Sequence, residues 1–170
     1  APQAEALTEA KKSAPLADLV EIASPLSGQV KELSQATDPV FAQGVMGQGV
    51  LIEPSQGDLL APVDGVVSVL FPTKHAVGIV SDQGVEMLMH IGMDTVNLEG
   101  KGFTAHVSQG DRVKAGDKLI SFDIDLIKDA GYVTETPVII TNQDQYQADA
   151  LGSLPRQIAV GDALMTATKI

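Results

Sequence analysis

The stretch GVVSVLFPTKHAVGIVSDQGVEMLMH, residues 65–90, consists of short apolar runs separated by polar turns. The runs are 65–70, 77–80 and 85–89. They are rich in β-branched and aliphatic residues, as strands are. The segment Ser81-Asp82-Gln83-Gly84 places turn-forming residues between the last two runs. The stretch therefore predicts neighbouring β-strands joined by short turns.

The same pattern continues on both sides of this stretch. Further apolar runs occupy residues 49–52 and 137–141, and polar turns occupy residues 54–57 and 109–111. Regular short strands between polar turns are typical of an antiparallel all-β sandwich or barrel. One short helix is expected over residues 124–130. We therefore predict an all-β fold with one or two short helical turns.

Two short motifs occur twice in the chain, which indicates internal duplication. Residues 24–30, SPLSGQV, recur as APVDGVV at 61–67, and residues 113–119, VKAGDKL, recur as IAVGDAL at 158–164. Each Pro-x-x-Gly unit predicts a turn that leads into a strand. Each Gly-Asp-x-Leu unit predicts the same, because glycine adopts backbone conformations that other residues resist. The sequence therefore predicts a sandwich built from two related halves.

The composition suits one domain with an aliphatic core. The chain has 170 residues, no Trp and only 4% aromatic residues. Its formal charge of -11 makes nucleic acid an unsuitable partner, because a net anion gains no counterion release from phosphates. A basic protein patch matches this charge better. There is no cysteine, hence no thiol chemistry, and no stretch is long enough to cross a bilayer.

Residues 1–17 differ in composition from the rest of the chain. Alanine, proline and charged residues dominate there, and Leu7 is the one large apolar residue between residues 4 and 12. We interpret residues 1–17 as a flexible linker or N-terminal tail and residues 18–170 as the folded domain. A linker at this position indicates a domain that follows others in a fused polypeptide.

Two histidines, fifteen residues apart, each stand at the end of an apolar segment. His75 lies within Phe71-Pro72-Thr73-Lys74-His75-Ala76, and His90 ends Val85-Glu86-Met87-Leu88-Met89-His90. In strands that share a sheet, this spacing leaves room for a strand, a turn and a second strand, so that the imidazoles can lie side by side. Neutral imidazole is nucleophilic near pH 7 and also binds metals. The pair suits transfer of a charged group or metal binding.

Phosphoryl transfer would place definite demands on this pair. As acceptor, His90 needs an unprotonated Nε2 that faces the phosphate, with Nδ1 protonated and held by an acceptor. His75 would donate to the phosphate oxygens, and Thr73, expected on the same strand face, would orient His75 through its hydroxyl. Apolar surroundings would exclude water and so favour transfer between proteins over hydrolysis. His106 is interpreted as an ordinary residue at a strand end.

A docking surface is expected around the two histidines. Transient docking sites commonly combine an apolar centre with charged residues at the edge. Acidic residues at this edge would receive a cationic partner. The candidate residues are Asp38, Val40, Phe41, Met46, Phe71, Leu88 and Asp94.

The segment HIGMDTV at 90–96, followed by LEGKGF at 98–103, closely resembles the glucose-family IIA domain of the bacterial phosphotransferase system (PTS). The resemblance extends over residues 20–168. It implies an antiparallel β-sandwich with a duplicated hybrid motif, and a phosphotransferase component. It also implies that the phosphoryl group is carried by His90, hydrogen-bonded by His75 and supported indirectly by Thr73.

The same resemblance implies partners. In the family, phosphate arrives from the phosphocarrier HPr and leaves to a cysteine of the IIB domain during sugar uptake. Because this chain has no cysteine, it resembles the IIA step alone. Family members are cytoplasmic proteins or cytoplasmic domains of membrane-bound transporters, so the membrane is reached only through the transporter. No cofactor is required, although members can share Zn²⁺ between the counterparts of His75 and His90 and a partner's carboxylate.

A zinc-dependent β-sandwich endopeptidase is the alternative function. A catalytic zinc ion needs three protein ligands and an open position for water. His75 and His90 supply two, so Asp94 or His106 would have to supply the third. The chain lacks the His-x-His pair expected of such peptidases. A biotinyl or lipoyl carrier is set aside, because residues 110–119 resemble its turn but no lysine stands at the required hairpin tip.

Overall fold

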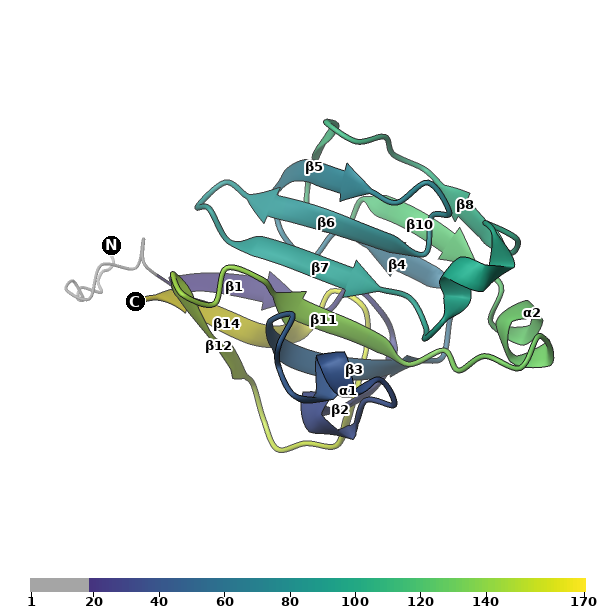
Figure 1. Cartoon of the computed structure of the whole chain (residues 1–170). Coiled ribbons are helices and arrows are strands. Elements are labelled where there is room, and N and C mark those ends of the chain that lie inside the picture. The colour runs from purple at the N-terminus through teal and green to yellow at the C-terminus, as the bar shows by residue number, and fades with distance from the viewer. Residues whose placement is uncertain (1–18) are drawn as a thin grey trace.

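A computed structural model describes residues 19–170 as a set of packed β-sheets (Figure 1). The strands are β1 (Leu19–Ala23), β2 (Gly28–Glu32), β3 (Gln48–Pro54), β4 (Asp58–Leu60), β5 (Gly65–Leu70), β6 (Ala76–Ser81), β7 (Glu86–His90), β8 (Phe103–Ala105), β9 (Arg112–Val113), β10 (Lys118–Phe122), β11 (Thr136–Ile140), β12 (Tyr146–Ala150), β13 (Arg156–Ile158) and β14 (Ala163–Lys169). The helices are α1 (Pro39–Ala42) and α2 (Ile124–Asp129), with 3₁₀ turns η2 (Leu33–Gln35) and η3 (Thr95–Leu98). The predicted linker at residues 1–17 lies outside the described residues.

The described strands form three sheets with antiparallel neighbours. The large sheet has eight strands in the order β13-β2-β3-β11-β7-β6-β5-β9, and the small sheets are β1-β14-β12 and β4-β10-β8. The predicted antiparallel all-β fold is therefore confirmed. The runs predicted at 65–70, 77–80 and 85–89 correspond to β5, β6 and β7. Figure 1 shows β6 and β7 side by side, with β5 above and β11 below them.

The two copies of each repeated motif make matching hydrogen bonds. The Gly116 N–H donates to the Ala61 carbonyl at 2.9 Å, and in the other half the Gly161 N–H donates to the Ser24 carbonyl at 3.0 Å. In both halves, the glycine of a Gly-Asp-x-Leu unit thus donates to the residue before the proline of a Pro-x-x-Gly unit, which lies in a distant segment of the chain. This equivalence supports the predicted duplication.

The glycines of the two Pro-x-x-Gly units begin equivalent strands. Gly28 begins β2 and Gly65 begins β5. A Cβ added to Gly28 would lie 2.0 Å from the Glu53 carbonyl oxygen, and one added to Gly65 would lie 2.1 Å from that of Val80. Only glycine permits such a close approach between strands, so the repeated glycine has the same steric role in both halves.

The large sheet is covered on both faces. Alternate residues of β7, Met87 and Met89, join the main core on one face. The residue between them, Leu88, joins a smaller cluster on the other face, as expected for side chains that alternate along a strand. We call this cluster the small core; its buried members are Leu33, Ala36, Phe41, Leu51, Ala76, Leu88, Met93 and Ile139. It provides an apolar base at the end of the β6–β7 hairpin.

Both α-helices begin with an aspartate cap. The Asp123 carboxylate accepts a backbone N–H of α2, which confirms the helix predicted at residues 124–130. The Asp38 carboxylate accepts the Val40 N–H at 2.9 Å, and Pro39 occupies the first helical turn. An aspartate followed by proline is a helix-start signal, but α1 was not predicted as a helix. In the described part of the chain, every helix is too short or too polar to span a membrane.

Candidate functional site

The β6–β7 hairpin brings the two histidines together, as their spacing predicts. Ala76 pairs with His90 in the register of the hairpin. The Ile91 N–H donates to the His75 carbonyl at 2.7 Å. The centroids of the two imidazole rings lie 4.9 Å apart with an interplanar angle of 79°. The rings therefore meet nearly edge to face.

His90 has one ring nitrogen engaged by the backbone. Its Nδ1 lies 2.7 Å from the Gly92 carbonyl oxygen. A carbonyl oxygen only accepts, so Nδ1 carries the proton and Nε2 of the neutral ring keeps its lone pair. Burial lowers the pKa of His90, and the Gly92 hydrogen bond and the charges of Asp38 and Asp94 only partly oppose this effect. The neutral ring therefore predominates at pH 7.

His75 is almost completely buried. Its exposed fraction is 3%. Burial, together with the neighbouring His90, lowers the pKa of His75 to about 4. Both imidazoles are thus neutral near pH 7, which leaves each ring with one nitrogen able to donate and one able to accept.

Thr73 contacts His75 but does not lie on a strand, which corrects the prediction that both occupy one strand face. The Thr73 Oγ1 lies 2.6 Å from the His75 Nδ1. Both residues belong to the turn that precedes β6, and Lys74 between them has a left-handed φ of 63°. This bend, rather than the alternation of a strand, brings the hydroxyl to the ring.

The loop after β7 holds the Gly92 carbonyl in place. Gly92 has a φ of +74°, and an added Cβ would lie 2.6 Å from the Thr95 Cγ2. Thr95 is fully buried, and its hydroxyl donates to the Ile91 carbonyl at 2.5 Å. Neither of these two supporting residues was predicted from the sequence. The glycine and threonine that follow His90 at short spacing were the available signal.

Aromatic side chains flank both imidazoles. The ring centroid of Phe41 lies 5.2 Å from that of His90, and the centroid of Phe71 lies 5.3 Å from that of His75. Phe41 and Leu88 are only 6% and 9% exposed. These two members of the predicted docking surface therefore form the base of the site and offer little area to a partner.

Other members of the predicted docking surface are exposed. Val40 and Met46 are 45% and 42% exposed. Val45 and Val96, which the sequence analysis did not select, are also exposed. Val40 and Val96 lie within two residues of Asp38 and Asp94 in the sequence, and exposed apolar side chains beside charged ones are typical of a surface where another protein docks.

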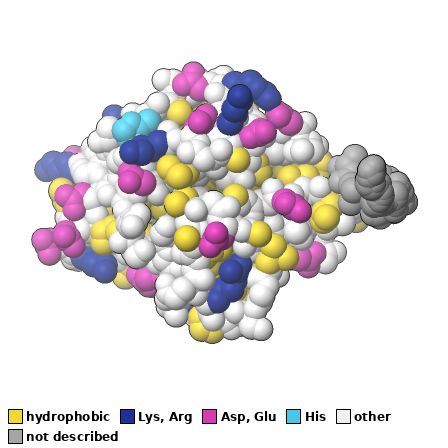
Figure 2. All heavy atoms as spheres, turned by 180° about the vertical axis from the view of Figure 1, so that it is seen from behind, with side chains coloured by type: hydrophobic (Ala, Val, Ile, Leu, Met, Phe, Trp, Pro, Cys, Tyr) yellow, Lys and Arg dark blue, Asp and Glu magenta, His cyan; other side chains and the backbone are white. Residues whose placement is uncertain are grey.

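Two predicted acidic residues act on His90. Asp38 and Asp94 both raise the pKa of His90 through their charge. Asp38 is held by its role as the cap of α1, and Asp94 precedes η3 with a left-handed φ of 60°. Elsewhere the charges are mixed: acidic and basic side chains lie interspersed on the face seen in Figure 2.

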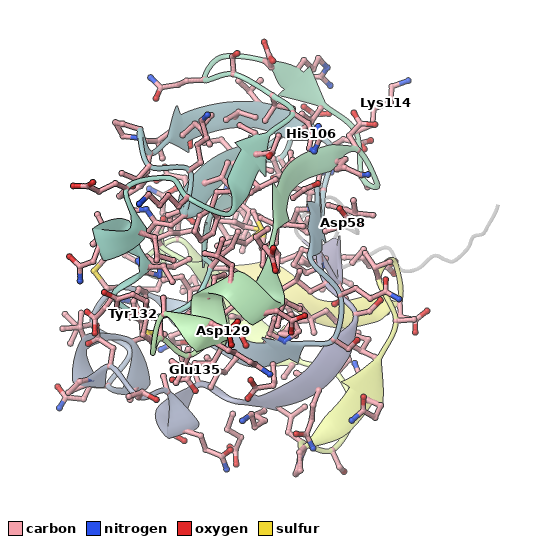
Figure 3. All side chains as sticks on the ribbon, turned by 90° about the vertical axis from the view of Figure 1, so that its right-hand side faces the viewer. Asp58, His106, Lys114, Asp129, Tyr132 and Glu135 are labelled. Carbon is pink, nitrogen blue, oxygen red and sulfur yellow. The ribbon has the colours of Figure 1, made fainter. Side chains whose placement is uncertain are left out.

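His106, labelled in Figure 3, directly follows β8 of a small sheet, whereas His90 ends β7 of the large sheet. Its Nε2 is 2.8 Å from the Ser121 Oγ, and this hydroxyl donates to the Asp58 Oδ1 at 2.9 Å. Among residues 19–170, no three His, Cys, Asp or Glu side chains are grouped as metal ligands. The geometry therefore does not favour the peptidase alternative, which needs a third zinc ligand beside His75 and His90.

Sequence comparison relates this chain to proteins of one sugar transport system. Residues 20–146 match the family described as phosphoenolpyruvate-dependent sugar phosphotransferase system, EIIA 1. The beta-glucoside-specific EIIBCA component of the PTS of Bacillus subtilis is 58% identical over 125 residues, which cover 74% of this chain and 20% of that protein. The glucose-specific EIIA component of Bacillus cereus is 54% identical over 123 residues, which cover 72% of this chain and 74% of that protein. The chain thus spans a fifth of the first relative and most of the second.

A solved structure agrees with these sequence relatives. The glucose permease IIA from Mycoplasma capricolum superposes with a TM-score of 0.79 at 36% identity, covering 87% of this chain and 95% of that one. The fold that the two proteins share is the β-rich one that carries His75 and His90 in this chain. The chain therefore belongs to the EIIA 1 family of the phosphoenolpyruvate-dependent sugar phosphotransferase system, and so to its phosphotransferase components.

Proposed function

We propose that the Nε2 of His90 accepts a phosphoryl group from phosphorylated HPr and passes it to a cysteine of a IIB domain during sugar uptake. The observation that carries this proposal is a neutral imidazole whose tautomer is set by the Gly92 carbonyl, with a second imidazole 4.9 Å away. Relatives from Bacillus subtilis and Halalkalibacterium halodurans are named EIIBCA components, which supports IIB as the acceptor. The protein then acts in the cytoplasm and reaches the membrane only through the transporter.

Each transfer is a displacement at phosphorus. In this family the donor is a phosphohistidine of HPr. In the first step the His90 Nε2 bonds to phosphorus while the P–N bond of that donor breaks, and the donor imidazole leaves neutral when its second nitrogen is protonated. His90 keeps its Nδ1 proton and becomes cationic, a charge that the Gly92 carbonyl, Asp38 and Asp94 stabilise. In the second step a IIB thiolate attacks phosphorus, and His90 leaves as the neutral imidazole.

His75 and Thr73 assist at the phosphoryl oxygens in this scheme. When the Thr73 hydroxyl donates to the His75 Nδ1 across 2.6 Å, the His75 proton lies on Nε2, which then donates to the phosphate. The low pKa of His75 keeps this ring neutral before transfer, so it meets the incoming phosphoryl group as a hydrogen-bond donor and not as a cation. The neighbouring Phe41 and Phe71 limit the access of water.

The transfer itself requires no cofactor in this proposal, whereas a zinc ion fits the site only with help from a partner. Neutral imidazoles are good zinc ligands, and the His90 Nε2 has a lone pair to offer. Within the described chain no third ligand is grouped with the two histidines. To hold zinc, His75 and His90 would need a further ligand, such as a carboxylate of a partner protein, and His75 would have to carry its proton on Nδ1, donated to the Thr73 Oγ1, so that Nε2 is free to bind.

The exposed residues around the site are proposed to dock both partners. Val40 and Met46 supply apolar contact, and Asp38 and Asp94 supply negative charge for a basic surface. Such charges mainly accelerate the encounter, so high salt is expected to slow transfer from HPr more than it changes the chemistry at His90.

Labelling by phosphorylated HPr tests the role of His90. His90→Gln removes the acceptor nitrogen and is expected to abolish labelling, whereas the matched control His106→Gln keeps it. His75→Gln retains acceptance, but onward transfer to IIB slows on the order of a hundredfold, because a donor to the phosphoryl oxygens is altered. An acid-labile, base-stable phosphoprotein formed by the His90→Gln variant would show that the assignment is wrong.

A further inference from the structure

The segment from Val133 to Glu135, just before β11, touches two separate parts of the site. The Met93 N–H donates to the Val133 carbonyl at 3.3 Å. A Cβ on Gly92 would lie 2.7 Å from the same carbonyl oxygen, so the loop that holds His90 packs tightly on this segment. Two residues later, Glu135 contacts the chain that leads into α1. One short segment thus borders both the loop after His90 and the helix beside it.

Glu135 is a buried carboxylate that the transfer scheme does not use. It is only 7% exposed, and Figure 3 labels its position. Its Oε1 accepts the backbone N–H of Thr37 at 2.7 Å, across 98 positions of sequence. Burial of a carboxylate is unfavourable unless hydrogen bonds compensate, and a short bond from a backbone N–H to a carboxylate is among the stronger ones. Glu135 is therefore a firm anchor for Thr37.

Thr37 leads directly into a segment that acts on His90. The next residue, Asp38, caps α1 and acts on His90 through its charge. Phe41, within α1, places its ring 5.2 Å from the His90 ring. Helix α1 has only four residues, too few to be stable by themselves, so its position depends on tertiary contacts.

We propose that Glu135 is a positioning residue for the phosphoryl site. Its carboxylate anchors Thr37, and this anchor keeps Asp38 and Phe41 against the His90 ring. Loss of the anchor lets α1 move away, which removes a stabilising charge from the ring and admits water to the site. The structural part of this inference is independent of the chemistry, whereas its effect on transfer rests on the proposed role of His90.

Variants that break the bond from either end test this proposal. Glu135→Met removes the acceptor at similar side-chain length, and Thr37→Pro removes the donor N–H. Glu135→Gln keeps an acceptor oxygen and should rescue function. Glu53→Met is a matched control, because Glu53 accepts from Thr134, the residue next to Glu135, without contacting Thr37.

The first readout is the nuclear Overhauser contact between the rings of Phe41 and His90, which needs no phosphoryl donor. We expect Glu135→Met and Thr37→Pro to weaken this contact and to slow transfer from phosphorylated HPr about ten- to a hundredfold, as small misplacements near a reacting group do. The double variant should be no worse than either single one, because both break the same bond. Glu135→Gln should stay within about twofold of wild type in transfer rate, and Glu53→Met should keep the contact.

The outcomes separate this inference from the proposed function. An unchanged contact between Phe41 and His90 in folded Glu135→Met and Thr37→Pro proteins would overturn the positioning role. Should Glu135→Met not fold, Thr37→Pro decides the question alone. If the contact weakens as expected while wild-type protein is labelled at a residue other than His90, the positioning role stands and the proposed role of His90 fails.

Discussion

The environments of His90 and His106 differ although the hydrogen bonding of the two rings is similar. The His90 Nδ1 donates to the Gly92 carbonyl. The Ser121 hydroxyl gives its proton to Asp58, so the His106 Nε2 must donate to Ser121. The surroundings therefore set the tautomer of each neutral ring, and the other ring nitrogen keeps its lone pair. A set tautomer alone does not make a phosphoryl site.

The two rings differ in their surroundings. His90 lies at the end of a central strand of the large sheet, between a second imidazole and the ring of Phe41. His106 follows β8, an edge strand of a small sheet, and is exposed. Water reaches a group at an exposed edge freely, which favours hydrolysis over transfer. Lower exposure and a neighbouring imidazole therefore distinguish His90 from His106.

Displacing the carbonyl that orients His90 should have the largest effect. In Gly92→Ala the new methyl group meets Thr95 and Val133, and the residue keeps a positive φ, so we expect a loss of about 2–4 kcal/mol of stability and most of the transfer activity. Gly116→Ala is the control: its φ is also positive, but no atom lies within 4 Å of the added Cβ. It should lose only about 1 kcal/mol. Urea unfolding and labelling by phosphorylated HPr measure the two effects. Equal losses of stability and labelling in Gly92→Ala and Gly116→Ala would contradict the prediction.

The buried pair should make stability depend on pH. The pKa of His75 is about 4 in the folded protein, against 6.5 for the unperturbed group. Between these values the unfolded chain binds more protons, so stability falls as pH is lowered through this window and is retained above it. His75→Gln removes this titration, and we expect wild type to lose more stability than the variant between pH 7 and 4. Urea unfolding across this pH range measures the stability of both proteins. Equal losses of stability in wild type and in the variant would refute the prediction.

Breaking the hydrogen bonds of His106 should have the smallest effect. Ser121→Ala removes the hydroxyl that links His106 to Asp58 on the protein surface. Exposed polar contacts contribute little, so we expect a change below about 1 kcal/mol and unaltered labelling by phosphorylated HPr. Thermal unfolding and the same labelling assay measure this. A clear loss of labelling would mean that the surroundings of His106 and the site at His90 are coupled.

Much of the fold could be predicted because its signals are local. The runs at 65–70, 77–80 and 85–89 and the helix at 124–130 are each marked by neighbouring residues alone. The convergence of His75 and His90 also followed from spacing, because a hairpin leaves few other arrangements. By contrast, Thr73 was predicted on a strand face and lies in a turn, since a left-handed residue at Lys74 is not signalled by its side chain.

The sequence by itself determined the strand pattern, the duplicated turns, the histidine pair and the family, because each depends on residues close together or on similarity read along the chain. Only the tertiary structure decided which residues support the site. Leu88 and Phe41 are covered because a second cluster packs on the large sheet, and Glu135 reaches Thr37 across 98 positions. Burial and long-range hydrogen bonds depend on which distant segments meet, and no local pattern specifies that meeting.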